Sequence, residues 1–307
     1  MSLNVLIDQL ARFAVPFFFV ISGYFWGIKT RRSASPIPAS VSMAKKILTI
    51  FLAWSAIYAL PVDFGSFAEY GPLGPIKADY WNLNGLIHDP LTLIMQGTSV
   101  HLWFLVGLLC ALLICAPLVK NKQLKTLIAV SVALYIFGLL AKSYSATPFG
   151  IHINFNTRNG PFFGTLFFVS GYLLSSLKPT PKWLGTGLAI LGIGYLLHFL
   201  ELYLLWSWYG TSPHQDYVIG TYFMGVGAAI AALSNHRFLQ NDALSDLGKL
   251  TLGLYAIHFI FVEMLRPIGK LTTSPFWELG YVILVLMLSV AAVMLLSKHK
   301  MARKIVV

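Results

Sequence analysis

Apolar residues run through this chain in long, nearly uninterrupted stretches that show no alternation with period two. A helix that crosses a bilayer needs about 20 predominantly apolar residues. Continuous stretches predict helices, since the strands of a membrane barrel alternate apolar and polar positions. The pattern therefore predicts an all-α, polytopic transmembrane bundle, organised as one integral-membrane domain over residues 1–307. Nine stretches approach or reach the required length and are the predicted spans: 8–28, 46–62, 100–118, 124–141, 160–177, 183–206, 217–234, 250–267 and 276–297.

The composition supports a membrane location. Of the 307 residues, 57% are hydrophobic and only 11% are charged, whereas charged residues make up about 25% of a typical soluble protein. Most of the surface is therefore expected to face lipid or other apolar helices. The two cysteines, Cys110 and Cys115, share one apolar stretch and point in different directions on a helix, so we interpret them as packing residues.

Lysine and arginine residues sort between alternate loops of this nine-span arrangement. Sixteen of the 22 fall on one side of the membrane and six on the other. By the positive-inside rule the richer side is cytoplasmic, which places the N-terminus outside and the C-terminus in the cytoplasm. The first span begins almost at Met1 with no basic segment before it. We therefore expect a further helix upstream, which would return the N-terminus to the cytoplasm.

The net charge of +11 has two possible sources, topology and a charged ligand. No basic patch is interleaved with aromatic residues on a polar segment, so we expect no nucleic-acid partner. The basic loop 29–46 either reflects topology alone or contacts the phosphates of a nucleotide-bearing donor such as coenzyme A. Neither a glycine-rich phosphate loop nor a Cys/His metal-binding spacing occurs in the sequence, and we expect no bound metal.

One polar stripe marks the span at 250–267. Thr251, Tyr255 and His258 follow the spacing i, i+4 and i+7, which places them on one face of a helix. Inside a membrane, His258 is either a general base or substrate contact, or a packing residue bonded to a neighbouring hydroxyl or carbonyl.

Two arginines on the predicted outer side are candidate substrate contacts. Arg12 follows Asp8 by four residues, so the two side chains can pair on a helix. It precedes Pro16 by four residues, which predicts a break in the first span. Arg158 precedes the span at 160–177 and is either an anion or sugar contact or a solvated loop residue.

Further polar residues lie close to the outer ends of other spans. The segment His101-Leu102-Trp103-Phe104 opens the third span, where histidine and tryptophan are either substrate contacts or ordinary interfacial residues. Tyr195, His198 and Glu201 step by three along the sixth span, and we interpret them as structural pairing partners.

Four motifs occur in a characteristic order and together resemble the bacterial membrane-bound acyltransferase family 3, in particular the subgroup that O-acetylates the enterobacterial common antigen. The resemblance extends over essentially the whole chain. The motifs are Arg12 followed by Pro16-Phe17-Phe18-Phe19-Val20-Ile21-Ser22-Gly23-Tyr24, His101-Leu102-Trp103-Phe104-Leu105, Phe167-Phe168-Val169-Ser170-Gly171-Tyr172, and Leu252-Gly253-Leu254-Tyr255-Ala256-Ile257-His258.

The resemblance implies a bundle of about ten helices in the bacterial inner membrane. It also implies transfer of an acyl group, commonly acetyl from acetyl-CoA, to a hydroxyl of a cell-surface polysaccharide or lipid-linked glycan. The matched positions are then expected to line a central cavity. The resemblance matches the stretches around Arg12, His101 and His258 to characteristic positions of the family. Together with the residues singled out above, the catalytic candidates are His258, Tyr255 and His101, and the candidate substrate contacts are Arg12, Arg158, Trp103 and Ser22.

The chain departs from the family in one respect. Family members open with a helix that carries an arginine and a histidine, and the residues before Asp8 supply neither. Without such a helix, His258 is the first candidate base within the membrane and His101 the second. Two alternatives stay open: a non-catalytic carrier or flippase for a glycolipid or small anion, and an inactive truncated paralogue.

Overall fold

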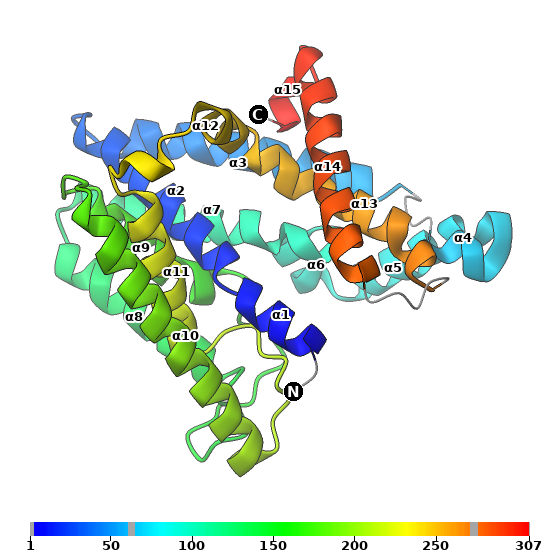
Figure 1. Cartoon of the computed structure of the whole chain (residues 1–307), viewed down its shortest axis with the longest axis horizontal. Helices are drawn as coiled ribbons and strands as arrows, with labels where there is room; N and C mark the ends of the chain where they lie inside the picture. The colour runs from blue at the N-terminus through cyan, green and yellow to red at the C-terminus, as the bar shows by residue number, and fades with distance from the viewer. Residues whose placement is uncertain (1–2, 61–64, 271–275, 307) are drawn as a thin grey trace. The chain divides into compact units, whose positions relative to one another are not determined.

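The computed structural model describes residues 3–60, 65–270 and 276–306, and every regular element within those ranges is helical. This confirms the all-α prediction for the described part of the chain. The elements, drawn in Figure 1, are α1 (Leu3–Ala11), α2 (Ala14–Arg31), α3 (Ile37–Tyr58), α4 (Gly65–Tyr70), η1 (Gly71–Leu73), α5 (Gly74–His88), α6 (Pro90–Gln96), η2 (Val100–Leu102), α7 (Trp103–Lys120), α8 (Leu124–Leu140), α9 (Pro161–Leu174), α10 (Lys182–Tyr209), α11 (Ile219–Ala232), η3 (Arg237–Leu239), α12 (Asp242–Lys249), α13 (Thr251–Lys270), α14 (Phe276–Lys298) and α15 (Arg303–Val306).

Among the described residues, six stretches of helix are long and apolar enough to cross a membrane: Val5–Arg31, Ile37–Tyr58, Val100–Lys120, Lys182–Tyr209, Thr251–Ile268 and Leu279–Lys298. The other three predicted spans correspond to α8, α9 and α11, which have 17, 14 and 14 residues. At about 1.5 Å per residue, 14 residues extend about 21 Å, which is less than the roughly 30 Å of the hydrocarbon core. The count of nine spans therefore stays a prediction.

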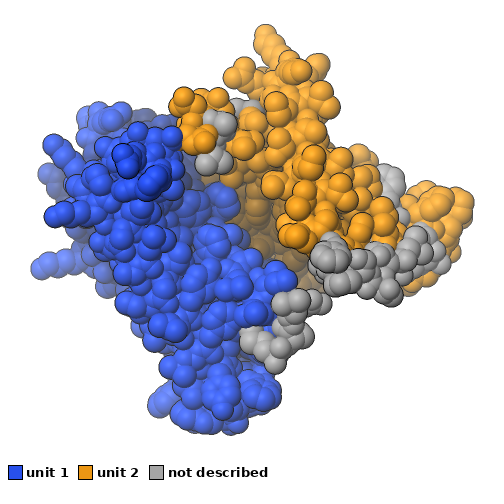
Figure 2. Space-filling model, in the orientation of Figure 1, with its two compact units in different colours: residues 1–44, 106–240 blue, residues 45–105, 241–307 orange. Residues whose placement is uncertain are grey.

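The helices group into two compact units, coloured separately in Figure 2. Unit 1 comprises residues 1–44 and 106–240, and unit 2 comprises residues 45–105 and 241–307. Each unit is built from two separate stretches of the chain.

Unit 1 packs its helices closely through glycines. A Cβ on Gly23 of α2 would overlap the carbonyl oxygen of Phe168 in α9, and a Cβ on Gly171 of α9 would overlap that of Val20 in α2. The similar segments 18–24 and 167–172 therefore lie against each other. Small residues of this kind allow two helix backbones to approach closely, and the same device joins α10 to α11, at Gly194 for example.

The predicted break in the first span is present. Helix α1 ends at Ala11 and α2 begins at Ala14, with a turn at Arg12 and Phe13. Pro16 lies in the first turn of α2, where the missing N–H removes no intrahelical hydrogen bond. The turn sets Arg12 apart from both helices.

Unit 2 is tied together by hydrogen bonds from aromatic side chains to backbone carbonyls. Trp54 of α3 donates its indole N–H to the carbonyl of Ile305 in α15 at 2.8 Å. Tyr58, one turn further along α3, donates its hydroxyl to the carbonyl of Ala256 in α13 at 2.8 Å. These contacts fix α13 and α15 against the second half of α3.

Candidate functional site

Unit 2 holds a cluster of aromatic and imidazole rings around His101, which we call the histidine cluster: Tyr58, His101, Tyr255, His258 and Phe259. The His101 ring centroid lies 5.3 Å from that of His258 and 5.7 Å from that of Tyr255. Phe259 stacks on His101 at 4.8 Å, and Tyr58 meets it edge-on at 5.0 Å. Three catalytic candidates predicted from the sequence are thus brought together.

Local helix geometry explains the arrangement. Tyr255, His258 and Phe259 fall at i, i+3 and i+4 on α13, so one helix face presents all three rings. His101 enters from η2, immediately before α7. Thr251, the third member of the predicted stripe, instead donates its hydroxyl to the backbone carbonyl of Gly248 at 2.9 Å.

Both ring nitrogens of His101 are engaged. Nε2 lies 3.2 Å from the carbonyl oxygen of Ala256, which can only accept, so Nε2 carries the proton. Nδ1 then accepts from the hydroxyl of Ser99 at 2.9 Å. His101 is therefore buried as a neutral ring with no nitrogen left for a substrate.

His258 differs from His101 in this respect. Its Nδ1 donates to the carbonyl oxygen of Tyr255 at 2.6 Å, so in the neutral ring Nε2 has the lone pair. That Nε2 makes no hydrogen bond to any residue in the described part of the chain. The side chain is only half-buried. Of the two histidines, His258 is the one that can accept a proton.

A cavity of about 280 Å³ lies beside the cluster and is lined by Ser99, Tyr58 and Phe259, all of which contact His101. Its volume is near the lower end of the range of about 300–1,000 Å³ for small-molecule pockets. The wall also carries polar side chains: Asp79, Asn82, Gln96, Thr98, Glu263 and Arg266.

Two of the charged side chains that line the cavity neutralise each other as an ion pair. Glu263 pairs with Arg266 at 2.8 Å, as their spacing of three predicts. Asp79 forms no ion pair with a described residue, and burial raises the pKa of its carboxyl. The cavity is therefore suited to a small polar group rather than to a hydrocarbon chain.

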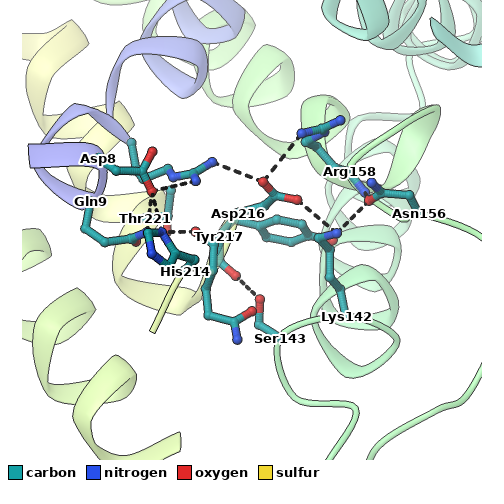
Figure 3. Close-up of polar contacts among 12 residues, drawn as sticks. Asp8, Gln9, Lys142, Ser143, Asn156, Arg158, His214, Asp216, Tyr217 and Thr221 are labelled. Carbon is teal, nitrogen blue, oxygen red and sulfur yellow. Dashed lines mark hydrogen bonds and ion pairs between the residues drawn. The ribbon is translucent and has the colours of Figure 1, made fainter. Parts of the chain in front are cut away.

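Unit 1 contains a second polar centre, which we call the Asp216 cluster: Asp8, Arg12, Lys142, Arg158 and Asp216 (Figure 3). Asp216 Oδ1 lies 3.0 Å from Nη1 of Arg12 and 3.5 Å from Nη1 of Arg158. Its Oδ2 lies 2.9 Å from Nζ of Lys142. The predicted pair of Asp8 and Arg12 is formed at 2.8 Å.

Burial acts to raise the pKa of Asp216, but the charges of Arg158 and Lys142 and the Lys142 hydrogen bond outweigh it, and the pKa lies below its usual value. The carboxylate is therefore ionised at neutral pH. Asp216 and Lys142 carried no signal in the sequence that linked them to Arg12.

A chain of hydrogen bonds runs inward from this cluster. Gln9 donates its amide to Asp8 at 2.9 Å and accepts from Nε2 of His198 at 2.9 Å. His198 Nδ1 then accepts from the hydroxyl of Thr221 at 3.1 Å, which in turn accepts from the backbone N–H of Val218. His198 is fully buried and neutral in this arrangement, which fits a structural role.

The spacing of three residues suggested that Glu201 could pair with His198, but Glu201 makes other contacts. It accepts from the hydroxyl of Tyr144 at 2.6 Å and from the backbone N–H of Gly220 at 2.7 Å. Tyr195 donates to the carbonyl of Leu10 at 2.8 Å. Each of these three residues therefore pairs with another element rather than along its own helix.

The sequence-predicted site residues divide between the units. Arg12, Arg158 and Ser22 lie in unit 1, whereas His101, Trp103, Tyr255 and His258 lie in unit 2. Ser22 lies half-buried in α2 and Trp103 is buried at the start of α7. Sequence reasoning missed Ser99 and Tyr58, because a serine in a loop and a tyrosine in an apolar helix have no distinguishing spacing.

Comparison with curated proteins gives two enterococcal relatives. An amino-acid racemase of Enterococcus faecalis is 26% identical over 178 residues, covering 54% of this chain and 23% of that protein. A serine/alanine racemase of Enterococcus gallinarum is 27% identical over 181 residues, covering 53% of this chain and 23% of that protein. The chain thus matches about a quarter of the length of either relative. No solved structure matches the chain.

The match to a family model covers much more of the chain than the match to either relative. A family model described as an acyltransferase domain matches residues 1–297. The match runs through both units and includes all four sequence motifs. With six helices long and apolar enough to cross a bilayer, this chain is a multi-pass membrane protein that belongs to acyltransferase family 3.

Proposed function

We propose that this protein transfers an acyl group, most simply acetyl from acetyl-CoA, to a hydroxyl of a cell-surface polysaccharide or lipid-linked glycan. The observation that carries the proposal is the unpaired Nε2 of His258 in a chain of the acyltransferase family. A general base for O-acylation needs an accessible lone pair close to the attacking hydroxyl. The cavity beside the histidine cluster supplies a polar space of the right scale for one sugar unit.

In the proposed reaction, Nε2 of His258 takes the proton of the acceptor hydroxyl as its oxygen attacks the thioester carbonyl carbon. The carbon–sulfur bond breaks, and the departing thiolate of coenzyme A takes the proton from the imidazolium. An ester and a free thiol result, and His258 returns to its neutral state. The Nδ1–H bond to the Tyr255 carbonyl fixes the tautomer that makes Nε2 the base.

His101 has a supporting role in this proposal. Because its two nitrogens hold Ser99 and the Ala256 carbonyl, it positions the segment of α13 that carries Tyr255 and His258. Tyr255 orients the reacting groups, and Trp103 of the same unit is a substrate contact.

The location follows the family and the charge distribution. We propose a nine-span protein in the bacterial plasma (inner) membrane with a cytoplasmic C-terminus. Acetyl-CoA approaches from the basic cytoplasmic side. The segment 29–46, which was expected to be a loop, offers Lys29 and Arg31 in the last turn of α2 and Arg32 directly after it. The subgroup it resembles, which O-acetylates the enterobacterial common antigen, makes an outer-surface glycan the first acceptor to test.

The experiment follows radiolabelled acetyl from acetyl-CoA into glycans in membranes that contain the wild type or His258→Ala. Loss of a general base lowers the rate roughly 100- to 10,000-fold. His152→Ala is the matched control, because His152 is exposed in a loop of unit 1. Wild-type labelling by His258→Ala would remove His258 from the site.

The same assay distinguishes the proposed acyltransferase from the two alternatives, a carrier and an inactive paralogue. A carrier for a glycolipid or small anion consumes no acetyl-CoA, and an inactive paralogue neither consumes it nor transports. The relatives' names describe racemases, but the similarity covers only 23% of each of those proteins. We therefore do not extend racemisation to this chain.

A further inference from the structure

The Asp216 cluster carries more positive than negative charge. Arg12, Lys142 and Arg158 supply three cations, and Asp8 and Asp216 supply two carboxylates. The five side chains are between 18% and 39% exposed, so water screens them only in part. The cluster formed by these five described residues therefore has a net positive charge of one, and a partly buried positive charge attracts an anion.

Donors also outnumber acceptors. Lys142 uses two of its three N–H bonds, on Asp216 and on Asn156 Oδ1 at 2.8 Å. Nε of Arg12 is buried and has no hydrogen-bond partner among the described residues. The contact from Arg158 to Asp216 is 3.5 Å, longer than the roughly 2.8 Å of a strong charge-assisted bond. One carboxylate is thus shared among three cations, and Nε of Arg12 and the third N–H of Lys142 have no hydrogen-bond partner among the described residues.

The cluster joins segments that lie far apart in the sequence. Arg12 lies between α1 and α2, Lys142 follows α8, Arg158 precedes α9 and Asp216 precedes α11. All of these positions are helix ends or loops. A ligand can therefore approach the cluster without parting two packed helices.

From the charge count and the shared carboxylate we propose that the Asp216 cluster binds the phosphate group of a ligand, in competition with the Asp216 carboxylate. Arginine recognises phosphate through paired N–H bonds, and lysine contributes a point charge. A phosphate monoester brings about −1.5 to −2 charges and three acceptor oxygens. A ligand carboxylate brings no more charge or acceptors than Asp216 already does, so phosphate is the better match.

This inference does not depend on acyl transfer, because its direct consequence is binding. Two sources share the required chemistry: a phospholipid headgroup and a soluble or sugar-linked phosphate. Both are accommodated by the same three cations.

The test titrates inorganic phosphate into the purified full chain in neutral maltoside micelles, followed by calorimetry. The wild type should bind saturably in the millimolar range, and Asp216→Asn should bind about tenfold more tightly because the internal competitor has lost its charge. Lys142→Gln and Arg158→Gln should each weaken binding several-fold. Asp246→Asn is the matched control, because Asp246 forms an exposed ion pair with Lys249 in unit 2.

A second titration uses micelles doped with phosphatidylglycerol. A weaker apparent affinity for phosphate would identify the lipid headgroup as the occupant, and an unchanged affinity would identify a soluble phosphate ligand.

Equal phosphate affinities in the wild type and Asp216→Asn would overturn the proposal, as would the absence of saturable binding in both. Should Asp216→Asn fail to fold, Lys142→Gln and Arg158→Gln decide the matter. If both variants fold and bind phosphate with the wild-type affinity, the proposal of a phosphate site is also refuted.

Discussion

Unit 1 and unit 2 both enclose polar side chains in an apolar helical frame, but they hold those side chains by different means. In unit 1, ionised groups from separate segments meet at Asp216, and helices are joined through glycines. In unit 2, neutral rings meet at His101 and are held by bonds to backbone carbonyls.

The difference explains why chemistry is assigned to unit 2. The ions of the Asp216 cluster pair with one another and join separate loops, and the lowered pKa of Asp216 makes that carboxylate a poor proton acceptor at neutral pH. The histidine cluster is uncharged and leaves one basic nitrogen, Nε2 of His258, without a partner among the described residues. A neutral imidazole is the side chain best able to gain and lose a proton near neutral pH.

The largest expected effect breaks the close packing of unit 1. Gly171→Leu places a side chain against the backbone of Val20 and Tyr24, which cannot move aside without separating α2 from α9. We expect destabilisation above about 4 kcal/mol, measured as thermal unfolding in detergent. Gly192→Leu on α10 is the control, since a Cβ there meets nothing within 4 Å.

Next comes the buried histidine of unit 1. His198→Leu leaves the Gln9 carbonyl oxygen and the Thr221 hydroxyl without their ring partner. The expected cost is about 2–3 kcal/mol in the free energy of unfolding. The same change at exposed His152 should leave stability unaltered. Equal stability of His198→Leu and the wild type would show that this hydrogen-bond chain contributes nothing.

The third effect depends on pH. Asp216→Asn removes a carboxylate shared by three cations and should cost about 2 kcal/mol at pH 7. The pKa of Asp216 is lowered, so its stabilisation is complete above the ordinary aspartate pKa of about 3.9 and disappears as the pH falls through the lowered value.

The difference in melting temperature between the wild type and Asp216→Asn should therefore be constant from pH 8 to 5 and should vanish only below about pH 4. Convergence near pH 6 would instead implicate a histidine.

The smallest effect belongs to unit 2. Tyr58→Phe removes one of two donors to the Ala256 carbonyl, and His101 still supplies the other. About 1 kcal/mol of stability should be lost. Tyr80→Phe is the control, because Tyr80 is exposed on α5. A loss as large as that of His198→Leu would mean that unit 2 tolerates a missing polar contact no better than unit 1.

Local spacing predicted much of what the structure contains. The Asp8–Arg12 pair, the break before Pro16 and the common face of Tyr255 and His258 all follow from periodicity within one segment. The spans of α9 and α11 were less predictable, because apolarity shows where a helix can lie but not where hydrogen bonding ends it.

Contacts between distant segments could not be predicted. Arg12 and Asp216 are 204 residues apart, and Asp216 follows a loop with no periodic pattern. His101 and the Ala256 carbonyl are 155 residues apart, and a backbone carbonyl leaves no trace in side-chain composition. The sequence already ranked His258 before His101 as candidate base, and the structure adds a physical reason, because both ring nitrogens of His101 are engaged.

The most direct test of the account measures free thiol released from acetyl-CoA by purified wild type and His258→Ala, with the thermal unfolding of both. In the described part of the chain His258 is hydrogen-bonded only to backbone groups of its own helix, at Tyr255 and Leu254, so its removal should cost little stability. The account predicts an unchanged melting temperature and thiol release at least about 100-fold slower. Thiol release at the wild-type rate by His258→Ala would contradict it.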